Sequence, residues 1–249
     1  MKVPELAEKL SVWIRERVRE TSVQGAVLGL SGGVDSAVVG ALCQRALRGK
    51  ALGLIMPCHS DPRDVRDALK TAQAIGLRTE TVILDRPFDI LMKSLHPSGK
   101  PLGKRDIAAA NVKPRLRMIT LYYYANRHNY LVVGTGNMSE LCVGYFTKYG
   151  DGGVDILPLG NLVKSDVRLL AGYLGIPQEI IDKPPSAGLW EAQTDEGELG
   201  VTYEELDAYL LTGQAPVGSE ERLLSLIKKS QHKRKLPPRP EFGSAQLER

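Results

Sequence analysis

The segment Gly29-Leu30-Ser31-Gly32-Gly33-Val34-Asp35-Ser36 constrains the fold of this chain more than any other stretch of its sequence. It begins at the end of an uncharged apolar run over residues 26–30 and leads into a helical pattern over residues 36–47. Such a run is typical of a strand buried on both faces of a parallel sheet. Open sheets of this kind bind ligands at the carboxyl ends of their strands. This glycine segment (residues 29–36) therefore indicates an α/β fold with a ligand site after its first strand.

The rest of the chain alternates short apolar runs with amphipathic stretches. Further strands are expected at 51–56, 79–84 and 130–133, and helices at 6–17, 36–47, 62–75, 88–95, 106–127, 163–174, 202–211 and 219–229. Within the long helix, Pro114 must introduce a kink or start a new helix. This order predicts parallel pairing with right-handed crossovers, which is a doubly wound, Rossmann-like sheet flanked by helices.

We expect a single domain over residues 1–249, because the sequence shows no internal repeat and no sharp change of composition. Turn-rich stretches predict mobile loops at about 96–104 and 184–200, the second of them as a lid. A basic tail over residues 232–249 is expected to follow the last helix. The extended appearance of residues 155–160 suggests a further segment beside the sheet.

Composition excludes several classes of protein. The net charge of +4 is too small to argue for a nucleic-acid partner. No stretch of about 18 apolar residues is present, so we expect no membrane span. The three cysteines, Cys43, Cys58 and Cys142, are odd in number and widely spaced, which argues against a disulfide scaffold or a zinc finger. A cytoplasmic protein is the simplest expectation, with Cys43 and Cys142 as small buried residues.

The residue types of the glycine segment suit a bound phosphate group. Glycines let the backbone approach an anion closely, and the following helix contributes free N–H groups and the positive end of its dipole. Ser31 and Ser36 add hydroxyl donors. Asp35 would repel a bare phosphate, so its presence makes sense only with a divalent cation between the two.

Other interpretations of the segment fit less well. The Walker A pattern and the dinucleotide pattern GxGxxG both fail on spacing. The hydrolase elbow GxSxG matches Gly29 to Gly33, but none of the four histidines lies in a convincing late strand–loop context. A plain strand–helix turn is the alternative for two glycines taken alone.

The sequence LSGGVDSA resembles the pyrophosphate loop of the ATP-pyrophosphatase superfamily, whose members cleave ATP to AMP and pyrophosphate. Six further blocks, NVKPRLRM, GTGNMSE, GYFTKYGDGGVDILPL, KPPSAGLW, QTDEGELG and HKR, resemble the ammonia-dependent NAD synthetases in the same order. The resemblance runs from the first helix to about Pro238. It implies that deamido-NAD and ATP form a nicotinate adenylate, from which ammonia displaces AMP.

The resemblance also implies roles for single residues. It assigns the glycine segment to the ATP phosphates and Mg²⁺ to Asp35 and Glu140. It assigns further ATP contacts to Thr135, Lys164 and Ser186, and deamido-NAD contacts to Arg115, Lys148, Asp155, His232 and Lys233. Asp151 matches a candidate that accepts a proton from ammonium, so Asp151, Lys164 and Asp35 are the expected catalytic residues. A cation such as Lys164 could neutralise charge on the α-phosphate or on the leaving pyrophosphate.

The resemblance further implies a homodimer with substrate sites at its interface, and Tyr122, Tyr123 and Tyr124 are candidates for that interface. No nucleic acid or membrane partner is expected. Glutamine-dependent relatives carry an additional amidohydrolase domain, for which 249 residues leave no room, so ammonia is the expected nitrogen donor. Two alternatives stay open: a relative that adenylates a tRNA base, and a non-catalytic adenine-nucleotide-binding protein.

Overall fold

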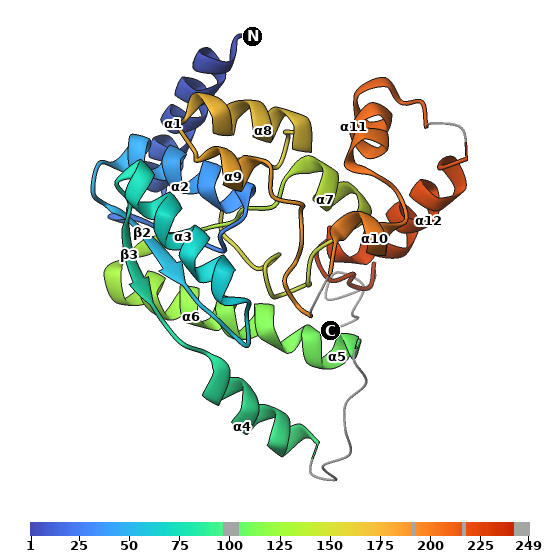
Figure 1. The fold of residues 1–249 in the computed structure, drawn as a ribbon, viewed down its shortest axis with the longest axis horizontal. Coiled ribbons are helices and arrows are strands. Elements are labelled where there is room, and N and C mark those ends of the chain that lie inside the picture. The colour runs from blue at the N-terminus through green and yellow to red at the C-terminus, as the bar shows by residue number, and fades with distance from the viewer. Residues whose placement is uncertain (97–104, 191–192, 216–217, 242–249) are drawn as a thin grey trace, which may run out of the picture.

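The computed structural model describes residues 1–96, 105–190, 193–215 and 218–241. Its centre is a four-stranded parallel sheet with the strand order β3-β2-β1-β4 (Figure 1). The strands are β1 (Gly25–Gly29), β2 (Ala51–Ile55), β3 (Arg78–Thr81) and β4 (Tyr130–Val133). The chain moves outward from β1 to β3 and then returns to the other side of β1 with β4. The predicted doubly wound α/β fold is confirmed.

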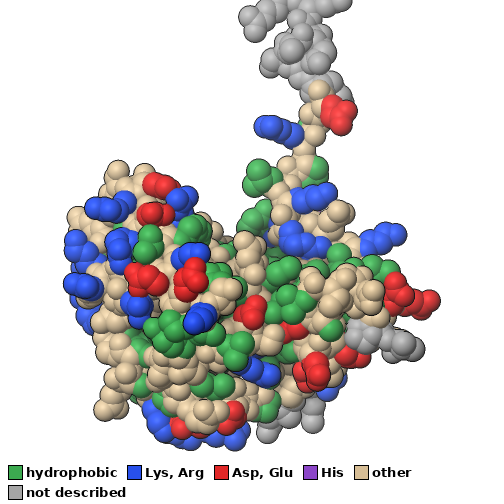
Figure 2. Space-filling view, turned by 90° about the horizontal axis from the view of Figure 1, so that it is seen from above, with side chains coloured by type: hydrophobic (Ala, Val, Ile, Leu, Met, Phe, Trp, Pro, Cys, Tyr) green, Lys and Arg blue, Asp and Glu red, His purple; other side chains and the backbone are tan. Residues whose placement is uncertain are grey.

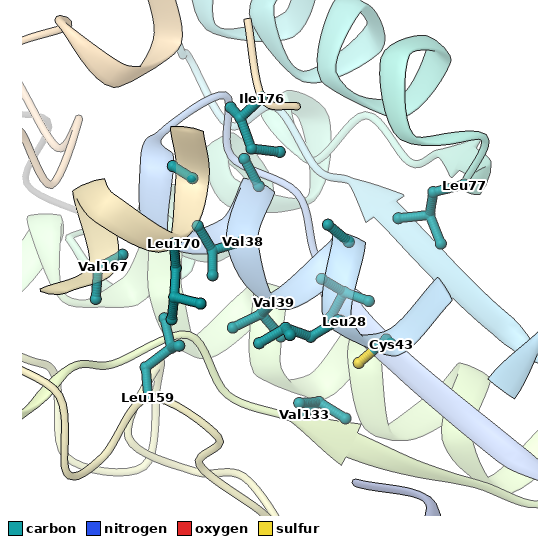
Figure 3. Close-up of a cluster of buried hydrophobic side chains, with 14 of the residues drawn as sticks. Leu28, Val38, Val39, Cys43, Leu77, Val133, Leu159, Val167, Leu170 and Ile176 are labelled. Atoms are coloured by element: carbon teal, nitrogen blue, oxygen red, sulfur yellow. The ribbon is translucent and has the colours of Figure 1, made fainter. Parts of the chain in front are cut away.

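Helices cover both faces of the sheet, which explains why β1 is apolar throughout. Ala26 and Leu28 contribute to one core, together with α1 (Val3–Glu20), α2 (Val34–Leu47) and α8 (Lys164–Tyr173). Figure 3 shows Leu28 lying among Val38, Val39 and Val133 in this core. Val27 points to the opposite face and packs in a second core with Val132 and the long helix α6 (Val112–His128). Alternation along the strand thus fills both layers with apolar side chains.

The remaining helices connect and flank this core. They are α3 (Pro62–Ile75), α4 (Asp85–Leu95), α5 (Ile107–Ala110), α7 (Met138–Val143), α9 (Gln178–Ile181), α10 (Asp195–Leu199), α11 (Tyr203–Thr212), α12 (Glu220–Ser230) and the 3₁₀ turn η1 (Gln231–Lys233). The predicted limits of α3 are confirmed, because the Asp61 side chain accepts a hydrogen bond from the Arg63 N–H and the helix ends at Gly76 with φ of 65°. Helices α10, α11 and α12 gather on one side of the sheet (Figure 1).

One predicted break is confirmed, and one predicted strand is shorter than expected. The helical stretch at 106–127 is divided into α5 and α6, and Pro114 lies in the first turn of the new helix α6. Proline has no N–H to donate to Ala110, so a continuous helix would lack a hydrogen bond there. The strand expected at 79–84 ends at Thr81, although the N–H groups of Val82 and Leu84 still bond to the carbonyls of Ile55 and Pro57.

Short elements were missed because three to six residues show no clear periodicity. The short helices α7, α9 and α10 were not predicted for this reason. Helix α10 lies inside the stretch predicted as a loop lid at 184–200. The extended segment expected at 155–160 is confirmed in part, since Ile156 forms a parallel bridge to Val133. Cys142 is half-buried rather than buried, whereas Cys43 is fully buried.

Parts of the predicted loops lie outside the described residues: most of 96–104, residues 191–192 of the lid, and 242–249 of the tail. Residues 235–241 are exposed and project from the body of the protein, as Figure 2 shows. In the described part of the chain, no helix is both long and apolar enough to cross a membrane.

Candidate nucleotide-binding active site

A cavity of about 680 Å³ opens at the carboxyl ends of β1 and β4. This is the switch point of the sheet, because β2 and β3 follow on one side of β1 and the chain then crosses to place β4 on the other side. The glycine segment, the start of α6, the turn around Asp151, the segment from Lys183 to Trp190 and the end of α12 all contribute to its lining. Segments far apart in sequence therefore meet at the predicted edge of the sheet.

The glycine segment is folded tightly at one wall of this cavity. Gly32 has φ of 83°, and a Cβ atom there would lie 2.4 Å from the Asp64 carbonyl oxygen, so only glycine fits. The Ser36 hydroxyl accepts a hydrogen bond from the Ser31 N–H at 3.2 Å and donates to the Gly33 carbonyl at 2.9 Å. No side chain among the described residues caps α2, so its first N–H groups face an open end suited to an anion.

Asp35, Glu140 and Lys164 form a buried charge cluster beside the glycine segment. The Lys164 side chain is 2% exposed, and its Nζ lies 2.5 Å from Asp35 Oδ2 and 3.4 Å from Glu140 Oε1. Burial by itself lowers the pKa of Lys164, but the two carboxylates outweigh it and raise the pKa. Burial and the neighbouring Asp35 raise the pKa of Glu140. The cluster therefore keeps a positive charge fixed at the cavity wall.

Helix ends position this cluster. Asn137 begins α7 with a capping box that includes Glu140, and its Nδ2 donates to Asp35 Oδ1 at 2.8 Å. Asp207 of α11 accepts hydrogen bonds from the Ser165 N–H at 2.8 Å and the Lys164 N–H at 3.3 Å. A carboxylate from another helix thus caps α8 and fixes the backbone from which Lys164 extends.

Tyr203 closes the cluster on the side of α11. Its hydroxyl lies 2.9 Å from Asp195 Oδ2 and 3.4 Å from Glu140 Oε1. The Lys164 ammonium lies 4.9 Å from the centre of the tyrosine ring, which provides a cation–π contact. Asp195 is 4% exposed, and its second carboxylate oxygen has no hydrogen-bond partner among the described residues.

Asp151 lies in a turn at another wall of the cavity. Its carboxylate accepts a hydrogen bond from the Thr147 N–H at 2.9 Å, and the Thr147 hydroxyl lies 2.6 Å from Asn111 Oδ1. Asp151 is exposed where it faces the open cavity, while the protein packed around its carboxylate raises its pKa by desolvation. A carboxylate with a raised pKa is suited to proton transfer near neutral pH.

The structure brings most of the predicted residues to this cavity. Thr135, Ser186 and Lys233 line it with the charge cluster and Asp151. The Lys233 ammonium donates to the carbonyls of Gly144 and Phe146, each at 2.7 Å. All of the predicted ATP and metal residues except Gly32 line this cavity, so these candidates form one site.

The other predicted deamido-NAD residues lie outside the cavity lining. Arg115 donates to the Lys148 carbonyl at 3.3 Å, and Lys148 Nζ donates to the His232 carbonyl at 2.8 Å, so these three residues form one chain of contacts. Asp155 is separate from them. Its carboxylate accepts hydrogen bonds from the Val132 N–H at 2.7 Å and the Tyr122 hydroxyl at 3.0 Å.

A comparison with protein families decides where the chain belongs, because the NAD synthase family matches residues 6–237. The chain belongs to the NAD synthase family. A curated relative, the NH(3)-dependent NAD(+) synthetase of Carboxydothermus hydrogenoformans, is 52% identical to this chain over 236 residues, which cover 95% of this chain and 97% of that protein.

Two solved structures share the fold of this chain over nearly its whole length. The NMN synthetase of Francisella tularensis has a TM-score of 0.91 at 39% identity and covers 97% of this chain and 100% of its own. The NH3-dependent NAD synthetase of Campylobacter jejuni has a TM-score of 0.78 at 33% identity, with the same coverage.

The sequence predictions did not include the residues that support this site. Asn137 carried a signal, since Asn followed three residues later by Glu is the spacing of a capping box. Tyr203, Asp195 and Asp207 carried no local signal, because an acidic or aromatic residue on a helix is usually solvated or packed in a core. The positions of Tyr203 and Asp207 depend on how α11 packs against α7 and α8, and Asp195 lies on the preceding helix α10.

Proposed function

We propose that this chain amidates deamido-NAD with ammonia at the expense of ATP, giving NAD, AMP and pyrophosphate. The observation that carries the proposal is the Lys164 ammonium held by Asp35 and Glu140 beside the glycine segment. Joining a carboxylate to a phosphate requires several anions in one place, and this cluster offers both a cation and carboxylates suited to a metal ion. Membership of the NAD synthase family supports the same reaction.

In the first step, the nicotinate carboxylate of the substrate attacks the α-phosphate of ATP. A P–O bond to the acyl group forms, and the bond to pyrophosphate breaks. The open N-terminus of α2 and the hydroxyls of Ser31 and Ser36 are placed to bind phosphate oxygens. Lys164 stabilises negative charge on the α-phosphate or the leaving pyrophosphate, as cationic clamps do in phosphoryl transfer. Thr135 and Ser186, which both line the cavity, would make further contacts with ATP.

Mg²⁺ is the proposed cofactor, and the chemistry of the donor groups fits it. Asp35 and Glu140 supply carboxylate oxygens, which Mg²⁺ prefers, and both are bound to the same ammonium. Among the described residues, no group of three or more His, Cys, Asp or Glu converges to hold a metal ion. ATP phosphate oxygens would therefore complete the coordination, and the ion would screen their charge from Asp35.

In the second step, ammonia attacks the carbonyl carbon of the acyl adenylate and AMP leaves. Ammonium must lose a proton first, since its nitrogen has no free electron pair. Asp151 accepts this proton, and its raised pKa makes it a stronger base than an ordinary aspartate. The Thr147 N–H holds its carboxylate at the cavity wall.

We also propose a homodimer, supported by exposed apolar side chains on two neighbouring helices. Ile119 and Tyr123 of α6 are 59% and 60% exposed, and Ile90 of α4 is 58% exposed. A face of this kind is typical of a protein–protein interface. Asp155, bonded to Tyr122 of the same helix, would contact deamido-NAD near this interface. The reaction is placed in the cytoplasm, where three cysteines stay reduced.

A second candidate substrate is nicotinate mononucleotide, which would undergo the same chemistry. It is favoured by the higher TM-score of the NMN synthetase, 0.91 against 0.78 for the Campylobacter jejuni NAD synthetase. The position of Asp155 outside the cavity also suits an acceptor without a second nucleotide. Both substrates present the same nicotinate carboxylate, so only a direct comparison of their reaction rates separates the two.

The experiment supplies purified protein with ATP, Mg²⁺ and an ammonium salt, and offers deamido-NAD and nicotinate mononucleotide in parallel. We expect NAD, AMP and pyrophosphate in equal amounts, with a higher kcat/KM for deamido-NAD. A preference for the mononucleotide would support the second candidate. ATP binding without any product would indicate the non-catalytic alternative, and AMP formation only with added tRNA would indicate the tRNA-modifying one.

A further inference from the structure

An ion-pair cluster ties the segment before Ser186 to helix α3. Lys183 Nζ lies 2.8 Å from Asp64 Oδ1 and 2.5 Å from Asp67 Oδ2. The three side chains are 26–29% exposed, so they are partly shielded from water. Both carboxylates come from neighbouring turns of α3, and each partner of Lys183 is therefore held on a rigid element. We call these three residues the α3 latch.

The same turn of α3 supports the glycine segment. A Cβ atom on Gly32 would lie 2.4 Å from the Asp64 carbonyl oxygen and 3.0 Å from Asp67 Cβ. Gly32 thus rests directly against the two residues that bind Lys183. Any shift of this turn would move the wall of the phosphate site and the anchor of Lys183 together.

The chain after Lys183 is short and stiff up to the predicted ATP contact. Pro184 and Pro185 restrict the backbone, and Ser186 follows at the cavity wall. The Ser186 hydroxyl accepts a hydrogen bond from the Gly188 N–H at 3.1 Å. At Gly188, which has φ of 60°, a Cβ atom would lie 3.7 Å from Asp64 Oδ2, so the chain returns to the same carboxylate. Ser186 therefore lies between Lys183, which binds the Asp64 carboxylate, and Gly188, which lies near the same carboxylate.

A second anchor holds the far end of this segment. Lys113, at the start of α6, donates to the Leu189 carbonyl at 2.9 Å and is 9% exposed. The Leu189 N–H donates to Gln193 Oε1 at 2.7 Å. With both ends held, the remaining freedom of Ser186 relative to the glycine segment depends on the α3 latch.

We propose that Asp64, Asp67 and Lys183 are positioning residues that place Ser186 over the glycine segment for ATP binding. The inference rests on the proposed function only in taking ATP as the ligand of this cavity. The latch touches neither the charge cluster nor Asp151, so breaking it should weaken ATP binding more than turnover at saturating ATP. Lys183 makes two partly exposed ion pairs, each worth about fivefold at most, so their joint loss supports an effect on the order of tenfold in affinity.

The chain offers a matched control on the same helix. Lys70 of α3 forms an ion pair with Glu179 of α9, and neither residue lines the cavity. Lys70→Met removes an ion pair between α3 and the segment that precedes Lys183, and the side chains of this pair are more exposed, at 53–55%. It reports the effect of losing an ion pair on α3 without loss of the latch.

The experiment compares wild type with Lys183→Met, Lys183→Arg, Asp64→Asn/Asp67→Asn and Lys70→Met. The Kd of MgATP is measured by calorimetry without the second substrate, and KM for ATP and kcat are measured in the full reaction. The rate of chymotrypsin cleavage after Leu189 or Trp190 reports how well ordered the segment is. Circular dichroism and thermal unfolding confirm that each variant is folded.

We expect Lys183→Met and the double carboxamide variant to raise the Kd and KM for ATP about tenfold, with kcat within about twofold of wild type. Lys183→Arg should restore affinity, and Lys70→Met should match wild type. MgATP should protect wild type from chymotrypsin more than Lys183→Met. Unchanged ATP affinity in folded Lys183→Met, or an equal loss in Lys70→Met, would overturn the inference. Failure of wild type to bind ATP would instead contradict the proposed function.

Discussion

The Lys164 ammonium lies 2.5 Å from Asp35 Oδ2, although the two residues are 129 positions apart in the sequence. Asp35 belongs to the glycine segment and stands in the first turn of α2, and Lys164 begins α8. Their contact joins the phosphate-binding edge of the sheet to the later helices. Because Lys164 is buried, its charge is fixed in place before any substrate arrives, which is the arrangement expected for electrostatic stabilisation of a transition state.

Replacing Lys164 by Met should remove both catalysis and the charge balance of the cluster. We expect kcat to fall on the order of 100- to 1,000-fold, as for the loss of one transition-state donor. Stability should also fall by roughly 3–5 kcal/mol, because Asp35 and Glu140 would stay buried without their cation. Steady-state kinetics and urea unfolding measure the two effects, and near-normal turnover in a folded variant would contradict the role of Lys164.

Replacing Glu140 by Gln should weaken the use of Mg²⁺. The amide keeps the size of the side chain but removes the charge, so we expect turnover to fall at least on the order of 100-fold at limiting Mg²⁺ and to recover in part at high Mg²⁺. Glu204→Gln on the exposed face of α11 serves as the control and should behave as wild type. An unchanged Mg²⁺ dependence in Glu140→Gln would show that Glu140 is not a ligand.

Replacing Asp207 by Asn should destabilise the protein more than other acidic substitutions on α11. Asp207 accepts hydrogen bonds from the N–H groups of Lys164 and Ser165 and lies 2.5 Å from the Ser139 hydroxyl. Loss of a charged helix cap of this kind costs about 1–2 kcal/mol. Chemical denaturation tests this value, again with Glu204→Gln as the control. An equal effect of the two substitutions would mean that the cap contributes little.

The raised pKa of Asp151 predicts an activity that falls as the pH is lowered, because the protonated carboxyl group cannot accept a proton from ammonium. Asp151→Asn should lose most activity near neutral pH. Its deficit should shrink as the pH rises, since free ammonia then becomes plentiful and needs no base. Rates at fixed total ammonium over a pH series test this, and a constant deficit at every pH would argue against proton acceptance by Asp151.

The same pKa shift also predicts an effect on stability. The folded protein holds the Asp151 proton at pH values at which the unfolded chain has lost it. The contribution of Asp151 to stability is thus fully present below the ordinary aspartate pKa and is lost as the pH rises through the raised pKa. Asp151→Asn removes this pH-dependent loss of stability. The unfolding free energy of the variant should therefore depend less on pH between the ordinary aspartate pKa and the raised pKa of folded Asp151.

Replacing Ile119 by Glu should disrupt the proposed dimer. A charge at the centre of an apolar interface is costly to bury, so we expect a monomer or a markedly weaker dimer in sedimentation experiments. Leu211→Glu is the matched control, because Leu211 of α11 is 68% exposed and lies away from α4 and α6. Dimers of equal strength in both variants would place the interface elsewhere.

The sequence by itself determined the parallel α/β fold and the place of the phosphate site. Two features suffice: uncharged apolar strands demand burial on both faces, and the glycine segment between strand and helix creates an anion site there. Ordered blocks such as KYGDGG also indicated the family and its catalytic candidates. Local patterns carry this information because the periodicity of apolar residues indicates both the secondary structure of a segment and the face that it buries.

The tertiary structure alone decided which side chains act together. The sequence could not show that Asp207 caps α8, that Tyr203 closes the charge cluster, or that Asp64 and Asp67 hold Lys183. Each of these residues has an ordinary surface role when it is considered alone. Their contacts join elements distant in the chain, so they depend on the packing of whole helices, for which a single sequence has no local signal.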